Sequence, residues 1–372
     1  MNKAENNDLK YRCPHCFSII GKKDYHMVCT DKNCLVVNGI TEVDIERSTT
    51  FGIDPSSPDA KDAFHHIVRS GNVCDICGRT LKIRVCPRCH HAIPPGAIDD
   101  FRNTIVVMGP LNGGLSHYIV SLVRQMGRIL EVEFNGKGHI HAADEEIRGR
   151  MRENYESRIN MCMTIPHSKS PSEPMVYYLS LNTDDKIVNI TLIFIDVASD
   201  DNGMPKLDHG SDIEGMISEA SGIILLIDPD TESEMHYSLG ILSHLTDLLK
   251  SSRYVDRNGH IDVPLAVTMT KCDLLMDGDK PLLGRPSTIH IKRPCGSVRN
   301  PHIPQIDAEV REIVRRGNGN ELLDLAESYS QNMFFAVSAI GYNPDNGTLP
   351  HGIVPFRVED PLLWLIERRM IS

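Results

Sequence analysis

Cysteine is the residue type whose spacing in this chain most clearly predicts chemistry. Of the 11 cysteines, eight come before residue 90 and form two groups of four. The first group is Cys13, Cys16, Cys29 and Cys34, and the second is Cys74, Cys77, Cys86 and Cys89. A C-x-x-C pair on a tight turn supplies two corners of a zinc tetrahedron, so two pairs complete one site. The spacing therefore predicts two structural zinc sites, one in each group.

The ligand set and the role of these sites leave alternatives. The second pair of the first group is irregular, so His15 or His26 could replace a cysteine there. Four thiolates leave no open position on zinc for water or substrate, which favours a structural role over catalysis. Basic residues surround the second group, but no aromatic side chains lie between them to stack on bases. We therefore favour protein docking and consider nucleic-acid binding unlikely.

The overall composition is typical of a folded, soluble protein: 372 residues, with 41% hydrophobic and 24% charged side chains. A net charge of −11 at pH 7 argues against a protein that coats nucleic acid or anionic lipid. The apolar runs are far shorter than the roughly 20 residues of a membrane-spanning helix, and the polar N-terminal segment lacks a signal-peptide core. We expect a cytoplasmic protein without membrane contact, in which cysteines bind metal.

The pattern of apolar residues divides the chain into three regions. We expect a first zinc ribbon over 1–45, a linker and second zinc ribbon over 46–100, and an α/β domain over 101–372. In the last region, apolar runs of strand length alternate with amphipathic stretches of helix length, which predicts a mostly parallel sheet flanked by helices. The expected strands are Thr104–Met108, Val176–Leu181, Asn189–Ile195, Gly222–Ile227, Pro264–Met269 and Met333–Val337. The expected helices are Ser116–Leu130, Glu214–Ala220, Glu232–Leu249, Glu309–Arg316, Glu321–Tyr329 and Glu359–Met370.

The first expected strand leads into a glycine-rich loop, GPLNGGLS, and then into a helix. In this context the backbone N–H groups of the loop surround a phosphate at the helix N-terminus. The loop fits the pattern G-x-x-x-x-G-K-[ST] except at the lysine, which would contact the β and γ phosphates and is Leu115 here. The residues expected to line a phosphate site are Gly109, Asn112, Gly113, Gly114, Leu115, Ser116 and His117.

Three further motifs follow expected strands, in order along the chain. An acidic residue ends the strand Asn189–Ile195, where it would help to hold Mg²⁺. The tetrapeptide T-K-C-D follows the next-to-last strand, and its carboxylate suits the N1–H and N2–H₂ donors of guanine. The dipeptide S-A follows the last strand and would touch the O6 edge of the base through a backbone amide. These expected contacts are Asp196, Thr270, Lys271, Asp273, Ser338 and Ala339.

Together these motifs resemble the P-loop GTPases of the TRAFAC-like class. Three segments are similar to the bacterial double-GTPase type, in which zinc ribbons precede a GTPase-like domain. They are the T-K-C-D loop, the D-V-A that follows the strand Asn189–Ile195, and the closing VEDPLLWLIER. The resemblance covers about Asn103–Arg369. It implies a P-loop GTPase-like fold that binds GTP or GDP with Mg²⁺. It also implies protein partners from the same multi-component bacterial system, including a GTPase-activating-like component, and a role in phage defence.

Two departures from the GTPase pattern fall at the phosphate end. Leu115 replaces the lysine, and Ser199 replaces the glycine of D-x-x-G. Hydrolysis requires lysine and Mg²⁺ to neutralise phosphate charge, so we expect GTP hydrolysis to be very weak or absent. The sequence therefore predicts a pseudo-GTPase that acts as a nucleotide-responsive or nucleotide-free scaffold. One alternative is an active switch completed by a partner, with Thr164 as a candidate magnesium ligand; a weaker one is a zinc-ribbon nucleic-acid sensor.

Overall fold

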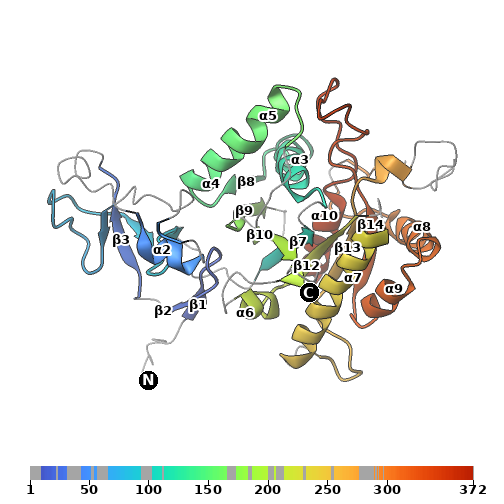
Figure 1. The fold of residues 1–372 in the computed structure, drawn as a ribbon, viewed down its shortest axis with the longest axis horizontal. Helices are drawn as coiled ribbons and strands as arrows, with labels where there is room; N and C mark the ends of the chain where they lie inside the picture. Colours follow the sequence, from blue (N-terminus) through green and yellow to red (C-terminus); the bar gives the residue numbers. More distant parts are fainter. Residues whose placement is uncertain are drawn as a thin grey trace. The chain divides into compact units, whose positions relative to one another are not determined.

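The computed structural model describes most of the chain (Figure 1). The described residues are 10–21, 24–31, 43–51, 54–56, 66–93, 103–110, 113–165, 173–182, 187–199, 205–206, 213–228, 232–252, 255–275, 289, 291, 293–295 and 297–371. The chain forms two compact units. One comprises Met1–Phe101 with Asp208–Met216, and the other comprises Arg102–Leu207 with Ile217–Ser372.

Short antiparallel strands build the N-terminal unit. Strands β1 (Lys10–Arg12) and β2 (Ile19–Gly21) pair with each other. A four-stranded sheet has the order β4 (His66–Val68), β3 (His26–Cys29), β5 (Ile83–Val85) and β6 (Ala92–Ile93). Helix α2 (Ile45–Thr50) begins at Asp44, whose carboxylate accepts a hydrogen bond of 3.0 Å from the backbone N–H of Arg47. Because β3 lies between two strands of the 46–100 region, both expected ribbons contribute to one sheet.

The second unit is an α/β fold around one mostly parallel sheet. Its described strands follow the order β14, β13, β12, β7, β10, β9, β8, and the short β11 pairs with the end of β10. Neighbours from β14 to β10 are parallel, whereas β9 is antiparallel to both β10 and β8. The bounds are β7 Thr104–Pro110, β8 Gly138–Ala142, β9 Met175–Asn182, β10 Ile187–Ser199, β11 Pro205–Lys206, β12 Gly222–Ile227, β13 Leu265–Met269 and β14 Asn332–Ala336. The predicted α/β class with a mostly parallel sheet is confirmed.

Burial explains which strands the sequence predicts and which it does not. Every residue of β7, β12 and β13 is buried, as expected for parallel strands that are covered on both faces, so each reads as a continuous apolar run. Strand β8, with the sequence GHIHA, lies at the sheet edge and alternates half-buried with exposed residues. It was not predicted because its exposed histidines interrupt the apolar pattern.

Helices cover both faces of this sheet. Phe334 and Phe335 are neighbours on β14, so their side chains point to opposite faces. The guanidinium of Arg311, on α8, lies 4.4 Å from the centre of the Phe334 ring, whereas Trp364, on α10, packs edge-on against Phe335 at 5.8 Å. Helices α8 and α10 therefore cover opposite faces. The helices of this unit are α3 Leu115–Arg128, α4 Glu145–Arg150, α5 Ser157–Asn160, α7 Glu232–Ser251, α8 Ile303–Arg316, α9 Asn320–Ala326 and α10 Asp360–Ile371, with π-helical segments at Ile129–Glu133 and Met151–Glu156. Helix α6, Ile213–Ser218, is divided between the two units.

The strand order reverses at β7, which lies in the middle of the sheet. From β7 the chain builds β8, β9 and β10 on one side, and it then crosses to β12 on the other side of β7. In open α/β sheets, a crevice for ligands forms at the carboxyl ends of the strands at such a point. The glycine-rich loop follows β7 directly and therefore lies at this crevice. Among the described residues, no helix has the length and apolar character needed to cross a membrane.

Candidate functional site

Four cysteine sulfurs of the N-terminal unit converge on one point. The Sγ atoms of Cys13, Cys16, Cys86 and Cys89 all lie within 4.8 Å of one another. The sulfurs of Cys13 and Cys89 are 3.7 Å apart, as are those of Cys16 and Cys86. Zn–S bonds of about 2.3 Å in a tetrahedron place neighbouring sulfurs about 3.8 Å apart, so this cluster fits zinc.

A second cluster contains Cys29, Cys74 and Cys77, with the sulfurs of Cys29 and Cys77 3.7 Å apart. Cys34 lies outside the described residues. The predicted grouping into residues 13–34 and 74–89 was therefore wrong, since the first and last C-x-x-C pairs build one site and the middle cysteines build the other. The shared sheet explains this, because β3 packs between β4 and β5, and the turn with Cys74 connects those two strands. Among the described residues, neither His15 nor His26 belongs to a cysteine cluster.

The three C-x-x-C turns share one backbone geometry. The residue after the second cysteine has a positive φ in each turn: 62° at Phe17, 70° at Gly78 and 55° at His90. Its N–H donates to the carbonyl oxygen of the first cysteine, at 2.8, 2.9 and 3.1 Å respectively. Phe17 and His90 hold this left-handed conformation although they carry a Cβ, which costs conformational energy. The turns are thus folded for metal ligation.

The electrostatics of the four-cysteine cluster also favour a cation. Burial raises the pKa of the Cys13 and Cys89 thiols well above the usual value. Four buried thiolates in contact would repel one another, so a divalent cation is required for all four to ionise. Both cysteine clusters could therefore hold zinc, and a complete thiolate shell would leave no place for a substrate.

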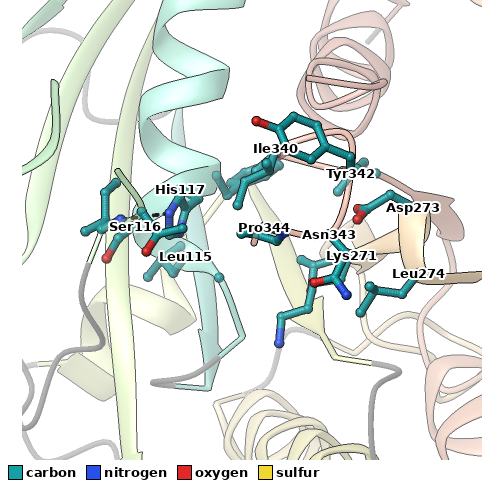
Figure 2. A pocket seen from close by; sticks show the side chains of 18 of the residues that line it. Leu115, Ser116, His117, Lys271, Asp273, Leu274, Ile340, Tyr342, Asn343 and Pro344 are labelled. Carbon is teal, nitrogen blue, oxygen red and sulfur yellow. Dashed lines mark hydrogen bonds between the residues drawn. The ribbon is translucent and has the colours of Figure 1, made fainter. Parts of the chain in front are cut away.

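The α/β unit contains a different kind of site, a pocket of about 360 Å³ at the carboxyl ends of the central strands. Figure 2 shows Leu115, Ser116 and His117 on one side of it and Lys271, Asp273 and Leu274 on the other. This volume lies within the range of small-molecule sites. Among the predicted nucleotide contacts, the pocket is lined by Gly114, Leu115, Ser116, His117, Thr270, Lys271, Asp273, Ser338 and Ala339.

The glycine loop joins β7 to α3. Strand β7 ends at Pro110, and α3 begins at Leu115, with Gly114 at φ 82° as the cap residue. This conformation favours glycine. A Cβ on Gly113 would lie 2.7 Å from the Cγ of Pro110, so a side chain does not fit there either. Asn112 lies outside the described residues. The loop thus delivers the backbone N–H groups of the first turn of α3 to the pocket, where the helix dipole favours an anion.

Position 115, beside these N–H groups, is a leucine where the phosphate-loop pattern has a lysine. Leu115 is 2% exposed and is packed into the first turn of α3. The ammonium of Lys271, which also lines the pocket, lies 2.5 Å from the carboxylate of Asp228, and Asp228 is 1% exposed. Asp228 comes at the end of β12 and was not predicted, because nothing in its local sequence indicates a partner on the next strand. The positive charge of Lys271 is therefore already balanced.

The loop after β13 is tied to the glycine loop. The Oγ1 of Thr270 lies 3.1 Å from the carbonyl oxygens of both Gly113 and Ile227, to which it donates. Lys271 then adopts a positive φ of 51°. The turn places the buried Asp273 in the wall of the pocket. Thr270 therefore fixes the distance between the expected base contact and the expected phosphate contact.

The loop after β14 forms another wall. The N–H of Ser338 donates to the carbonyl of Phe356 at 2.9 Å, and the carbonyl of Ala339 accepts a hydrogen bond of 2.7 Å from the hydroxyl of Ser121 on α3. Both predicted residues are thus held firmly at the pocket. The sequence did not predict the residues that follow them, because they lie in a loop without a recognisable motif. Those that line the pocket are Ile340, Tyr342, Asn343, Pro344 and Gly347.

Thr164 and His117 close the remaining side of the pocket. The Nε2 of His117 accepts a hydrogen bond of 3.0 Å from the N–H of Ile165. The hydroxyl and the N–H of Thr164 both donate to the carbonyl of Gly347, at 3.2 and 2.9 Å. Thr164, the candidate switch threonine, therefore lines the pocket, but its hydroxyl is engaged by the loop that follows β14.

Asp196, which was predicted to help hold Mg²⁺, does not line this pocket, whereas Ser116 does. Asp196 lies near the end of β10, opposite Gly109 of β7, and burial raises the pKa of Asp196 to about 7. A divalent cation in contact with this carboxyl group would lower its pKa again.

Comparisons with known proteins do not place the chain in a family. No protein-family model matches the sequence, and no curated protein matches it. The two cysteine clusters and the pocket of the α/β unit are the features from which a function can be inferred.

Proposed function

We propose that the α/β unit binds a guanine nucleotide without hydrolysing it, so that the chain acts as a pseudo-GTPase. The observation that supports this is the meeting of two distant motifs in one pocket. Gly113 and Thr270, 157 residues apart in sequence, are joined by a hydrogen bond. The glycine loop and Asp273 consequently line the same cavity. One end of the pocket offers backbone N–H groups for phosphate, and the other offers a carboxylate for a base.

The carboxylate of Asp273 gives the proposed specificity for guanine. A carboxylate only accepts hydrogen bonds, and guanine presents two adjacent donors, N1–H and N2–H₂. Adenine has no donor at N1 and no amino group at C2, so it would leave the buried carboxylate of Asp273 unpaired. We expect GDP and GTP to bind more tightly than ADP and ATP.

The absence of a free cation at position 115 supports the loss of hydrolysis. Leu115 brings no charge to the phosphate end, and Lys271 is paired with Asp228. Phosphoryl transfer depends on positive groups that stabilise the charge of the transition state. A nucleotide in this pocket would therefore stay intact and act as a bound signal.

The N-terminal unit would serve as the docking module for a protein partner. Its two cysteine clusters lie on the short strands and turns of a two-stranded and a four-stranded sheet, and bound zinc would stabilise these sheets in place of a large core. We propose that the partner is a component of the same bacterial system, such as a GTPase-activating-like protein in phage defence. A partner that supplies a cation could also restore hydrolysis, which is the alternative to a permanently inactive scaffold.

Isothermal titration of the zinc-loaded chain with GDP, GTP, ADP and ATP tests the proposal. The decisive variant is Asp273→Asn, because a carboxamide can donate to the C2 carbonyl of xanthine but cannot accept both guanine donors. We expect this variant to lose affinity for GDP and to gain affinity for xanthosine diphosphate. Asp324→Asn, an exposed change on α9, is the matched control and should bind GDP as the wild type does.

Three outcomes would contradict the proposal. Wild-type protein that binds no guanine nucleotide would exclude a functional base site. Equal binding of GDP and ADP would show that Asp273 does not read the base. Release of inorganic phosphate from GTP by the isolated chain, at rates well above the uncatalysed reaction, would show that hydrolysis was not lost.

A further inference from the structure

One wall of the pocket is built from two segments that are far apart in the sequence, the short segment after α5 and the loop after β14. Backbone hydrogen bonds pair them. The N–H of Thr164 donates to the carbonyl of Gly347 at 2.9 Å, and the N–H of Leu349 donates to the carbonyl of Cys162 at 2.7 Å. Thr164 and Gly347 both line the pocket, so the two segments form one continuous wall.

Further hydrogen bonds engage the remaining polar groups of the segment after α5. The hydroxyl of Thr164 also donates to the carbonyl of Gly347, at 3.2 Å, and the carbonyl of Thr164 accepts from the Nε of Arg158 at 3.0 Å. The N–H of Ile165 donates to the Nε2 of His117 at 3.0 Å. The N–H groups and the hydroxyl that Thr164 and Ile165 present at the pocket are thus all bonded within the protein.

The chain that follows Asp196 is held in a similar way. Strand β10 continues past Asp196 to Ser199, and the backbone of Ala198 and Ser199 pairs with β11. The hydroxyl of Tyr237, on α7, donates to the carbonyl of Val197 at 3.2 Å. The residues that take the place of D-x-x-G in this chain therefore belong to a paired strand.

This arrangement leaves little for a third phosphate to gain. In nucleotide switches, the γ-phosphate orders two loops whose polar groups turn toward it, and the loops are released when that phosphate is lost. Here Thr164 would first have to break its bonds to Gly347, and Ser199 would have to leave its strand. Each hydrogen bond broken in the protein offsets one formed with the phosphate, so the net gain in affinity is small.

We propose that the pocket recognises the nucleoside diphosphate part of its ligand and does not distinguish GDP from GTP. This inference rests on the proposed nucleotide binding and makes its signal specific: the chain responds to the presence of a guanine nucleotide and not to the ratio of GTP to GDP. The contacts that both ligands share are the N–H groups at the start of α3 and the carboxylate of Asp273.

Titration calorimetry of the zinc-loaded chain with GDP and with the non-hydrolysable GTP analogue GMPPNP, both in Mg²⁺, tests this inference. We expect the two wild-type dissociation constants to agree within about threefold. Thr164→Val should leave their ratio unchanged, whatever its effect on each constant, because the lost hydroxyl binds Gly347 and not phosphate. Thr348→Val is the matched control, since it makes the same change in the loop after β14, where the hydroxyl of Thr348 donates to the carbonyl of Asp345 at 2.6 Å.

Amide hydrogen exchange follows the paired segments directly. The N–H groups of Thr164 and Leu349 should exchange slowly in the nucleotide-free protein and should keep the same protection with GDP and with GMPPNP. Loss of protection at Thr164 with GMPPNP alone would overturn the inference. So would dissociation constants that differ by more than about threefold in the wild type, or a loss of GMPPNP affinity alone in Thr164→Val. Any of these results leaves the proposed function intact, whereas binding of neither nucleotide refutes the proposed function and this inference with it.

Discussion

The ammonium of Lys271 and the carboxylate of Asp228 form an ion pair of 2.5 Å at the carboxyl ends of the neighbouring strands β13 and β12. The two partners differ in exposure, since the side chain of Asp228 is 1% exposed and that of Lys271 is 33% exposed. Figure 2 shows the Lys271 side chain directed away from Asp273. The lysine that would lie along a base therefore also neutralises a buried acid.

This asymmetry predicts unequal effects of removing the two charges. Lys271→Met should lower the free energy of unfolding by about 1–3 kcal/mol, because it leaves the charge of Asp228 buried without its cation; the loss stays below that of a fully buried pair because Lys271 reaches solvent. Asp228→Asn should cost less, since the lysine can turn into water. Urea unfolding followed by the fluorescence of Trp364, the single tryptophan, reports on the α/β unit alone. A larger loss in Asp228→Asn would contradict this interpretation.

Each cysteine cluster combines members of both predicted groups. This arrangement predicts which double substitutions remove one zinc ion and which remove two. Cys13→Ser with Cys89→Ser affects one cluster, so the purified protein should retain about one zinc of two. Cys13→Ser with Cys29→Ser affects both clusters and should leave almost none. Zinc content measured by mass spectrometry decides between this arrangement and two sequential ribbons, for which the two results would be exchanged. Cys162→Ser, an exposed cysteine, is the control.

The sequence predicted those features that local patterns encode. Buried parallel strands such as β12 read as unbroken apolar runs, and the residues after β7, β13 and β14 were recognisable from short motifs. The cysteines that could hold zinc were recognisable from their spacing. Their grouping was not, because it depends on β3 packing between β4 and β5, which is a long-range pairing.

The features that the sequence did not predict come from contacts between distant residues. Asp228 meets Lys271 across two strands, 43 residues apart in sequence, and neither residue alone indicates the pair. Thr270, in the loop after β13, donates to the carbonyl of Gly113, 157 residues away in sequence. A polar residue on an irregular segment gives no signal in a periodicity analysis, and only the fold shows what it contacts.

The carboxyl group of Glu359, just before α10, predicts a pH-dependent stability. Burial and the neighbouring charge of Asp360 raise the pKa of Glu359. The folded state therefore favours the protonated acid, and stability is lost as pH rises from the unfolded pKa through the folded pKa. Glu359→Gln removes this loss, so its gain in melting temperature over the wild type should increase from about pH 5 to about pH 8. Glu367→Gln, on α10 and paired with exposed Arg299 at 3.5 Å, is the control. A gain that does not change with pH would contradict the assignment.

Restoring the missing lysine should make the stability of the α/β unit depend on its ligand. Leu115 is 2% exposed, so Leu115→Lys places an ammonium in an apolar position and should lower the melting temperature without nucleotide. GDP supplies the missing counter-charge, and a ligand at 100 times its dissociation constant stabilises by about 2.7 kcal/mol. At equal GDP concentration, the shift in melting temperature should therefore be larger in Leu115→Lys than in the wild type. Leu115→Met preserves the volume without the charge and should show the wild-type shift. Equal shifts in all three proteins would mean that position 115 does not face the phosphates, and the pocket would then require another ligand.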